Sequence, residues 1–360
     1  MATLVLSTVG TALGGPVGGA IGALIGQSFD QQLLAPARRG PRLGDLSVQT
    51  SSYGTQVPRV YGSMRVAGSV VWATDLVESE QTTGAKGQPD VTYSYSVSLA
   101  VALSSRPVAA IARIWADGNL LRGVEGDFKV PTTFRFYDGS EGQEIDPLIA
   151  SVEGIANTPA YRGLALAVFE NLELAAFGNR IPFMTFEVIA DSSPPTISSI
   201  LADASAGAIA SDDSQMVTGY AAYGASIAAA VQPLVDCFDL PLFDDGSTLR
   251  SPLDGAPIAI GSDELGNSAD GQKVGRVTRE QIPVRDVPST LRLTYYDAQR
   301  DYQSGEARAS AGDQSLNELQ QELPAVLSRR RQDAGSTNAG AAVVWARSAD
   351  PAIASGMDRH

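Results

Sequence analysis

The sequence of 360 residues contains one cysteine, Cys237, and one histidine, His360. A single cysteine excludes a disulfide framework, and the shortage of both residues excludes nearly all zinc sites and histidine-based nucleophilic sites. A Ser-His-Asp triad would have to use the last residue of the chain, where side chains are usually mobile. We therefore predict no catalytic residue, no metal and no cofactor, and the lack of disulfides suits assembly in a reducing cytoplasm.

The common phosphate and zinc-protease motifs are missing as well. The sequence has no GxxxxGK[ST] run, no GxGxxG between a strand and a helix, and no HExxH run. Phosphate, dinucleotide and zinc-protease chemistry are therefore not indicated. Cys237 lies in an apolar helical pattern with no histidine to activate it, which favours a small core residue over a nucleophile.

Basic residues are few. The chain has 26 lysines and arginines against 40 acidic residues, which gives a net charge of −14. A surface of this sign does not hold nucleic acid by releasing its counterions. If DNA meets this protein, we expect it to pass without specific binding.

Charge is absent between Thr3 and Ser28, and the first basic residue is Arg38. The stretch is nearly long enough to cross a bilayer. However, it lacks the basic leading segment of a secretory signal, and it has too much glycine and too few large residues for an ordinary transmembrane helix.

Glycine in this stretch recurs every four residues, at Gly14, Gly18, Gly22 and Gly26. On a helix these positions form one flat groove that lets a second helix approach closely. Each glycine costs a helix about 1 kcal/mol relative to alanine, so the groove needs a compensating contact. We interpret residues 1–37 as a helix that packs on copies of itself or enters a membrane; a flexible glycine-rich leader is the alternative.

Residues 38–192 are predicted to form a β-rich domain, because short alternating or β-branched runs are separated by Gly, Pro, Asn and Asp. Asp117-Gly118 predicts a tight hairpin turn after Trp115, since this dipeptide supplies the positive φ that such turns need. A helix is predicted near residues 146–153. The predicted strands include residues 59–61, 69–73, 92–101 and 132–137.

Pro194-Pro195 marks the predicted boundary with a second domain, residues 193–327, in which helices and strands are segregated. Residues 226–238 predict an amphipathic helix capped by Ser226, with Ile227, Val231, Leu234, Val235 and Phe238 on its apolar face. Residues 211–214 are expected in a solvated loop or a helix start. Strands are predicted on both sides of the turn 244–247, and a further strand pair between 272–282 and 290–296.

The pattern ends after Leu327, and residues 328–360 are interpreted as disordered or as a truncated tail. The fold class that follows is α+β and β-rich, with a glycine-rich N-terminal helix, a β-rich domain and a mixed α+β domain.

Acidic side chains offer the remaining candidate chemistry. Asp75, Glu78 and Glu80 lie close together in the sequence, and a glycosidase uses two carboxyl groups. No partner or sugar-stacking aromatic follows at a defined spacing, so a solvated polar loop explains them better. The runs 244–247 and 263–267 lack the spacing of calcium loops and are interpreted as turns.

Several long blocks occur in one order that resembles the baseplate hub proteins of phage tail tips, including the "megatron" protein of gene transfer agents. The blocks are residues 40–46, 52–68, 71–74, 92–103 (TYSYSVSLAVAL), 113–118 (RIWADG), 152–188 and 291–309. The positions that carry the resemblance, and that we expect to be structural, are Tyr53, Gly54, Pro58, Tyr61, Gly62, Arg65, Gly68, Trp72, Trp115, Asp117, Gly118, Tyr161, Arg162, Gly163, Phe177, Gly178, Asn179 and Pro182.

The resemblance implies a structural subunit of a phage or gene-transfer-agent baseplate hub, assembled in the bacterial cytoplasm and located at the tail tip of the particle. Its partners would be copies of itself, as a homotrimer around the tail axis, and the distal tail and other tail-tip proteins. It would also contribute to host-envelope attachment or penetration and to DNA passage. Longer relatives carry a domain similar to a glycoside-hydrolase barrel after the block that ends at Val188, whereas here Pro194-Pro195 follows, so we expect no hydrolase activity. An envelope-associated or secreted adhesin and a cell-wall glycoside hydrolase are the alternatives.

Overall fold

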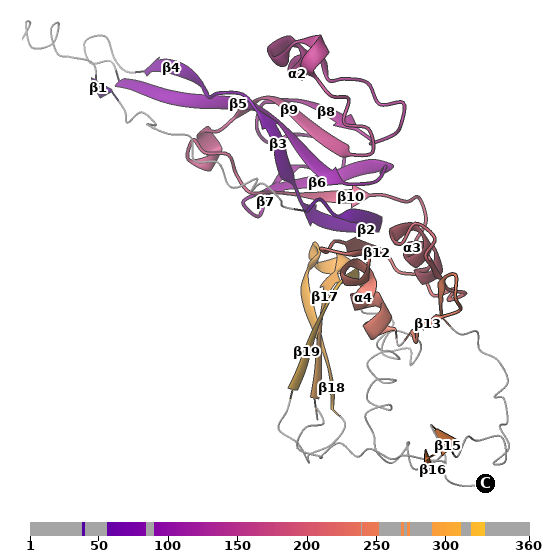
Figure 1. The fold of residues 1–360 in the computed structure, drawn as a ribbon. Coiled ribbons are helices and arrows are strands. Elements are labelled where there is room, and N and C mark those ends of the chain that lie inside the picture. Colours follow the sequence, from indigo (N-terminus) through magenta and orange to yellow (C-terminus); the bar gives the residue numbers. More distant parts are fainter. Residues whose placement is uncertain are drawn as a thin grey trace, which may run out of the picture.

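The computed structural model describes residues 38–39, 56–83, 90–238, 240–251, 268–269, 272–273, 290–310 and 318–327. The fold is α+β and β-rich, as predicted, with two large sheets and three α-helices among these residues (Figure 1). The predicted N-terminal glycine-rich helix and the segment 328–360 lie outside the described residues. No helix of the described part is long and apolar enough to span a membrane.

The first sheet has six strands, with β5 at its centre. The order is β1-β5-β9-β8, and β3 and β4 also pair with β5. Its strands are β1 (Arg38–Arg39), β3 (Ser69–Ala73), β4 (Val77–Thr83), β5 (Asp90–Ser104), β8 (Thr133–Tyr137) and β9 (Ala165–Glu173). The strands predicted at residues 69–73, 92–101 and 132–137 are therefore confirmed.

The second sheet has eight strands and joins the two halves of the sequence. The order is β18-β17-β19-β12-β2-β10-β6-β7. The strands from the N-terminal half are β2 (Arg59–Ala67), β6 (Ala110–Ala116), β7 (Asn119–Arg122) and β10 (Met184–Ile189). The others are β12 (Gly219–Ala222), β17 (Thr290–Asp297), β18 (Gln303–Ser310) and β19 (Glu318–Val326). Because β2 pairs with β12, the sheet is continuous across the Pro194-Pro195 segment.

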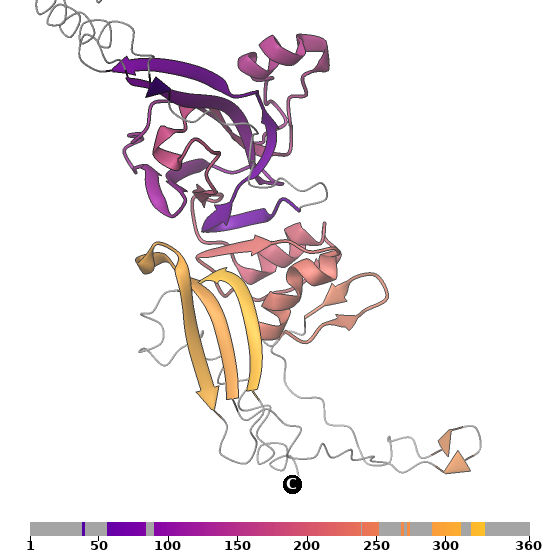
Figure 2. The same cartoon turned by 90° about the vertical axis from the view of Figure 1, so that its left-hand side faces the viewer.

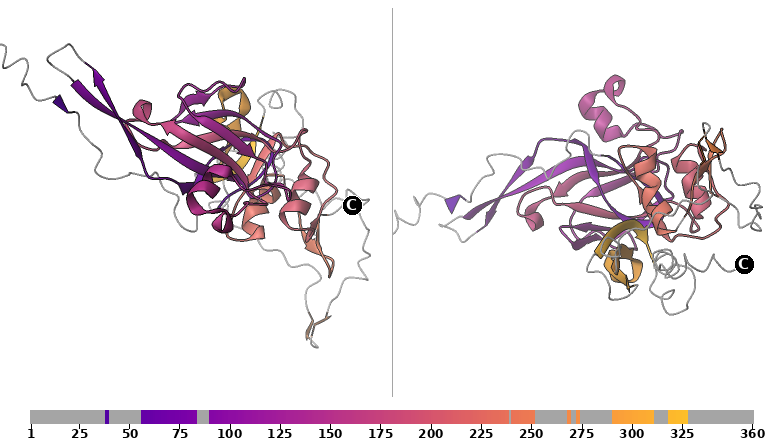
Figure 3. Two further views of the ribbon diagram at one scale, coloured as in Figure 1. Left: turned by 90° about the horizontal axis from the view of Figure 1, so that it is seen from above. Right: turned by 60° about the horizontal axis from the view of Figure 1, so that its bottom comes forward.

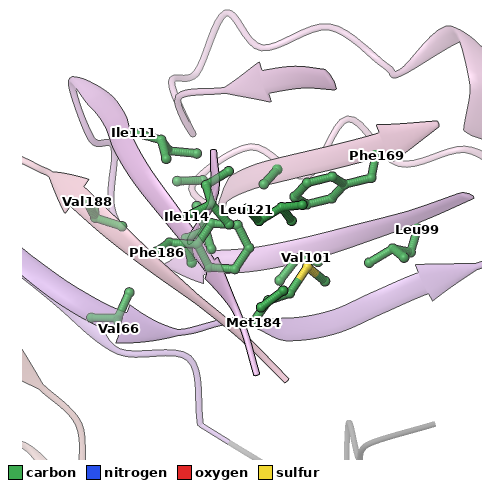
Figure 4. Packing of buried hydrophobic residues seen from close by; sticks show 14 of the residues in the cluster. Val66, Leu99, Val101, Ile111, Ile114, Leu121, Phe169, Met184, Phe186 and Val188 are labelled. Carbon is green, nitrogen blue, oxygen red and sulfur yellow. The ribbon is translucent and has the colours of Figure 1, made fainter. Parts of the chain in front are cut away.

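The first core lies between the two sheets (Figure 4). Side chains alternate in and out along each strand, so Val66, Phe186 and Val188 of the second sheet face Leu99 and Phe169 of the first. The ring centroids of Phe169 and Phe186 are 6.2 Å apart, and neither ring is exposed. Full burial of one such side chain stabilises the fold by about 1.5–3 kcal/mol.

The second core lies where helices α3 (Ile197–Ala204) and α4 (Ile227–Cys237) pack on β12 and β19. Ser226 caps α4 by accepting a hydrogen bond from Ala229 N, as predicted. Cys237 is buried in this core, as expected of a structural cysteine, and burial raises its pKa to about 12. Ile227 was predicted on the apolar face but is 49% exposed, because it occupies the first helical position, ahead of the turn that packs.

A third, smaller cluster fixes helix α2 (Pro147–Glu153) on the outer face of β5 and β9. The short helix η1 (Ile155–Asn157) follows, and η2 (Ala175–Phe177) comes after β9. Asp146 begins α2, since its carboxylate accepts hydrogen bonds from the N–H groups of Leu148 and Ile149. The same carboxylate pairs with Arg135 at 2.7 Å and accepts the Tyr137 hydroxyl at 2.8 Å, and its side chain is 4% exposed.

We expect Asp146→Asn to lower the free energy of unfolding by about 1–2 kcal/mol, because the amide can still cap the helix but no longer carries the charge that Arg135 and Tyr137 contact. Urea unfolding followed by circular dichroism measures the loss. Asp138→Asn is the control, because Asp138 makes a similar local turn bond to Ser140 N without an arginine partner. Equal losses in the two variants would contradict a role for the Arg135 pair.

One prediction for the second half needs correction, and one helix there was not predicted. Strand 290–296 does not pair with 272–282: β17 pairs along one edge with β18 and along the other with β19, so both of its edges are filled over these residues. Of the segment 272–282, the structure describes β16 (Gln272–Lys273), which pairs with β15 (Ser268–Ala269). Helix α3 was not predicted; Thr196 caps it directly after the two prolines.

The other predictions for this half hold. Residues 211–215 form a loop between β11 (Ile209–Ala210) and β12. Strands β13 (Phe243–Asp244) and β14 (Leu249–Arg250) flank the 244–247 turn. Strands β17, β18 and β19 form a projecting three-stranded blade, with η4 (Ala298–Arg300) at the turn between β17 and β18 (Figure 2).

Candidate functional site

Strand β2 is the element that connects the two halves of the molecule. Its neighbours in the sheet are β10 of the N-terminal half and β12 of the C-terminal half. Successive residues point to opposite faces, so Val60 is buried in the first core and Tyr61 in the second. We call β2 and the two polar clusters at its ends the junction, and it contains many of the positions that carry the family resemblance.

The first cluster joins β2 to helix α3. The Tyr61 hydroxyl donates to Asp203 Oδ2 at 2.7 Å, and Arg59 Nη2 donates to the same oxygen at 2.9 Å. The guanidinium of Arg106 lies 4.7 Å from the centroid of the Tyr61 ring. It also makes two bonds to Asp191, at 2.9 and 3.0 Å. Two arginines and two carboxylates therefore balance one another around a buried tyrosine.

Gly62 sits beside this cluster in a position that requires glycine. Its φ is +64°, and its N–H donates to Asp191 Oδ2 at 2.8 Å. A Cβ at this position would lie 2.2 Å from the carbonyl oxygen of Thr218. The backbones of β2 and of the segment before β12 therefore lie so close together that only glycine, which has no Cβ, fits at position 62.

The second cluster joins the same sheet to the turn between β17 and β18. Arg113 pairs with Glu187 at 2.6 Å and with Asp301 at 2.5 Å. The Tyr302 hydroxyl donates to Glu187 Oε1 at 2.9 Å, and Arg65 Nη1 donates to the Asp301 carbonyl at 3.0 Å. Asp301 and Tyr302 both have positive φ, which is uncommon for residues other than glycine, and Tyr302 is 8% exposed.

The ring of Trp115 is in contact with two cations of this cluster. The guanidinium carbons of Arg65 and Arg113 lie 3.9 and 4.8 Å from its ring centroid. Trp115 is 5% exposed, so the stacked arginines cover it. Cation–π contacts of this kind add about 0.5–2 kcal/mol each and fix the orientation of the guanidinium groups.

Three carboxylates of the junction, Asp191, Asp203 and Glu187, have pKa values below their ordinary range. Burial alone would raise the pKa of Asp191, but the hydrogen bonds from Arg106 and Gly62 N–H outweigh it. The same holds for Asp203 with Tyr61 and Arg59, and for Glu187 with Arg113 and Tyr302. Each group therefore stabilises the fold in its ionised form.

We expect the chain to lose stability as the pH falls below about 4.5, the ordinary range of these carboxyl groups. A lowered folded-state pKa gives stabilisation that is complete above the unfolded-state pKa and is lost as the pH falls through the folded-state value. Urea unfolding at pH 7 and pH 3.5 measures the difference. Asp191→Asn should flatten this dependence, and an unchanged slope in that variant would contradict the contribution of Asp191.

Beyond the junction, the predicted turn at Asp117-Gly118 is confirmed. Both residues have positive φ, at +49° and +82°. Asp117 also pairs with Arg180 at 2.7 Å and accepts a hydrogen bond from Phe183 N at 3.0 Å. The turn is thereby fixed to the segment before β10. In that segment Gly178 and Asn179 have positive φ, Phe177 packs on the first core and Pro182 is buried.

A second loop assembly contains Tyr161, Arg162 and Gly163. Gln143 is buried, accepts Gly139 N at 2.6 Å and donates to the carbonyls of Ala160 and Tyr161. The N–H of Gly163 donates to the Gly139 carbonyl, and Arg162 Nε donates to the Gln143 carbonyl.

The remaining predicted positions lie elsewhere. The Trp72 indole donates to Glu153 of α2 at 2.9 Å. Gly68 leaves room for Val101 and Phe186, and the Pro58 carbonyl accepts Ser105 N. Positions Tyr53, Gly54, Gly14, Gly18, Gly22 and Gly26 lie outside the described residues.

The acidic residues considered for catalysis do not converge. Glu78 and Glu80 lie on β4, where Glu78 accepts the Tyr95 hydroxyl at 2.8 Å, and Asp75 precedes that strand. No group of three or more His, Cys, Asp or Glu side chains in the described part could hold a metal ion. The 244–247 run forms a tight turn in which Asp245 accepts N–H groups from Ser247 and Thr248, as a turn residue does.

Sequence reasoning missed most of the charged residues of the junction. Arg106, Asp191, Asp203, Glu187 and Asp301 were not singled out. One signal was available, because Arg113 and Glu187 interrupt otherwise apolar strands, and a charge in such a position is usually paired. The partners of Asp203 and Asp301 lie more than 140 residues away in the sequence and had no local signal.

One protein family and one solved structure are similar to this chain. A family model described as "Putative phage tail protein" matches residues 226–348, which extends beyond the last described residue. Among solved structures, a chain in "Virion of native gene transfer agent (GTA) particle" is similar, with 26% sequence identity and a TM-score of 0.64. The similarity covers 94% of this chain and 84% of that chain. No curated protein matches. Together these similarities support a phage-tail-type structural protein of a virion.

Proposed function

Starting from a structural protein of the phage-tail type, we propose that this chain is a subunit of the baseplate hub at the tip of a phage or gene-transfer-agent tail. It assembles around the tail axis with copies of itself, as a homotrimer, and with the distal tail and other tail-tip proteins. It contributes to attachment to or penetration of the host envelope, and to the passage of DNA. It has no catalytic role of its own.

The observation that carries this proposal is the similarity to a chain of a gene-transfer-agent virion over 94% of the present sequence. If the two proteins shared a single domain, the similarity would cover only part of this chain. Here the similarity covers most of both chains, which supports a shared role. The sequence blocks that resemble tail-tip hubs lie on both sides of the junction.

The junction supports a role that needs a fixed geometry. It consists of a four-pair ladder between β2 and β12, with one polar cluster toward α3 and one toward the β17–β18 turn. Contacts on two sides of one strand resist bending better than a flexible linker would. A subunit that transmits force from the envelope to the tail tube requires this stiffness.

Charge supports the proposed contact with DNA. The net charge of −14 opposes condensation of DNA on the protein, which suits a surface along which DNA must move. In this interpretation the chain leaves sequence recognition and DNA binding to other components.

The test uses particles from a producing strain in which the chain carries an epitope tag. Gold-labelled antibody should mark the tip of each tail, and deletion of the chain should give particles without DNA transfer. Expression of the untagged chain should restore transfer. Label along the tail tube, or normal transfer by the deletion strain, would overturn the assignment to the hub.

A further inference from the structure

The two sheets that enclose the first core each have a second face that points away from it (Figure 1). Helix α2, coloured magenta, projects from the outer face of the first sheet (Figures 1 and 3). The outer face of the second sheet lies on the opposite side, because the core lies between the sheets. Each outer face exposes large apolar side chains, and the charges beside them differ in sign between the two faces.

On the outer face of the second sheet, Phe183 and Leu120 are exposed next to Trp115. Trp115 is directly opposite Thr185 on one side and Leu120 on the other, and directly opposite residues share a face. Phe183 comes two residues before Thr185, so it points to the same side. Phe183 is 45% exposed and Leu120 is 41% exposed, whereas the stacked arginines cover Trp115.

Arg65 stands beside these two apolar side chains and lacks an acidic partner. It donates to Thr185 Oγ1 at 2.8 Å and to the Asp301 carbonyl at 3.0 Å. Within the described residues it makes no ion pair, since the carboxylates of Glu187 and Asp301 pair with Arg113. Burial lowers the pKa of the Arg65 guanidinium, which nevertheless stays charged at neutral pH. With Arg65, the two apolar side chains form a surface that we call the cationic patch.

The C-terminal end of α2 carries the opposite charge. Val152 is 56% exposed, and Ile155, three residues further along, is 76% exposed. Glu153 lies between them in the sequence, and its Oε1 accepts the Trp72 indole N–H at 2.9 Å, which holds the carboxylate in place. Residues 138–163 contain five acidic residues and one basic residue, and none of the basic kind lies in the last turn of α2. We call Val152, Glu153 and Ile155 the acidic lobe.

The two surfaces are complementary, but they lie on opposite sides of one molecule. The lobe therefore does not reach the patch of its own chain. In a neighbouring copy, the Glu153 carboxylate can pair with the Arg65 guanidinium, and the apolar side chains of the lobe can cover those of the patch. Two lobes or two patches facing each other would bring like charges together, which disfavours a contact between identical surfaces.

From these features we infer that the acidic lobe of one copy binds the cationic patch of the next copy. The inference rests on the self-assembly in the proposed function and names the two surfaces through which the copies meet. A contact between two different surfaces runs head to tail, and it closes into a ring when the rotation between copies divides a full turn. The apolar side chains supply buried area, and the charge pair sets the orientation.

Disulfide trapping tests the contact in assembled particles. The native Cys237 is buried and does not take part. Chains with Ile155→Cys and chains with Phe183→Cys are co-expressed in the producing strain, and the purified particles are oxidised. We expect a covalent dimer whose tryptic peptides join positions 155 and 183. Particles that contain one variant alone should give no dimer, because like surfaces do not meet.

Met216→Cys replaces Phe183→Cys in the control. Met216 is 53% exposed but lies in the segment before β12, outside the patch. Dimers that join position 155 to 183 no more often than 155 to 216 would overturn the inference. Dimers that join 155 to 155 as readily as 155 to 183 would also overturn it, because the contact would then use identical surfaces.

A second measurement removes the charge of the lobe. Glu153→Gln keeps an oxygen that accepts the Trp72 indole N–H but carries no charge toward Arg65. In the Ile155→Cys chain it should lower the dimer yield at short oxidation times by about threefold or more, since charge pairs across an interface speed its formation and fix its register. Glu144→Gln is the control, because Glu144 is exposed but lies outside the lobe. Equal yields with the two variants would overturn the inference.

The location of the chain is scored separately in the same particles. Gold label at the tail tip without a dimer between positions 155 and 183 retains the proposed function and rejects this contact. Label elsewhere on the particle overturns the proposed function, whether or not the dimer forms.

Discussion

Substituting Gly62 by alanine is expected to destabilise the chain by about 2–5 kcal/mol, the combined cost of a left-handed conformation for a residue with a Cβ and of overpacking. The new methyl group would lie 2.2 Å from the Thr218 carbonyl oxygen. That oxygen belongs to the backbone beside β12, so no side-chain rotation relieves the contact. The ladder between β2 and β12 must open, or Gly62 must leave its hydrogen bond to Asp191.

Urea unfolding, followed by Trp fluorescence and circular dichroism, measures the loss. Gly118→Ala is a matched control, because Gly118 also has positive φ, at +82°, but has no atom within 4 Å of an added Cβ. It isolates the cost of the backbone conformation, about 1–2 kcal/mol. Losses of equal size in the two variants would show that the close approach of β2 to β12 contributes nothing.

Hydrogen exchange should also locate the damage. In Gly62→Ala, the amides of β12 and β19 should lose protection before those of β5 and β9, because the C-terminal half is joined to the sheet through β12. Uniform loss of protection would mean that the two cores unfold as one unit.

The sequence predicted the elements of this fold well because their signals are local. The Asp117-Gly118 turn, the Ser226 cap and the alternation in β5 each depend on neighbouring residues. The prediction for 272–282 and 290–296 failed because strand pairing depends on which edges remain free. One edge of strand β17 pairs with β18 and the other edge pairs with β19. The pairing with β19 is parallel and follows a longer connection.

The junction could be predicted in part. Tyr61, Gly62, Arg65 and Trp115 were singled out because they belong to blocks of family resemblance, but no physical role followed from the sequence. Their roles depend on residues far along the chain, such as Asp203 and Asp301. Helix α3, which carries Asp203, was not predicted, so its contacts could not be either.

The second large effect is expected for Arg113→Met, which should cost about 2–4 kcal/mol, since it breaks a largely buried ion pair while keeping an apolar stem over Trp115. Glu187 is 14% exposed in its side chain and would retain the Tyr302 hydroxyl as its direct partner. Asp301 would keep the bond from Arg65 to its carbonyl but lose its ion pair. The blade should therefore loosen at its turn, while the ladder between β2 and β12 remains.

A double-mutant cycle with Glu187→Gln separates the ion pair from packing. If the pair is responsible, Glu187→Gln costs much less in the Arg113→Met background than alone, with a coupling of about 1–3 kcal/mol. Lys129→Met is the control, because the Lys129–Asp127 pair is about half exposed on both sides and solvent screens it. Additive losses in the cycle would assign the effect to the contacts of the Arg113 guanidinium with Trp115 and Asp301.

The pH dependence gives an independent measure of the same pair. Arg113 is the main group that keeps the pKa of Glu187 low against the effect of burial. Without Arg113, burial dominates, the pKa of Glu187 rises, and protonation becomes favourable in the folded state. The stability of Arg113→Met should then approach that of the unmodified chain as the pH falls from 7 to 3.5, because the unmodified chain loses the pair while the variant no longer buries an unpaired charge. A constant difference across this range would mean that Arg113 acts on the blade through Trp115 and Asp301, and not through the charge of Glu187.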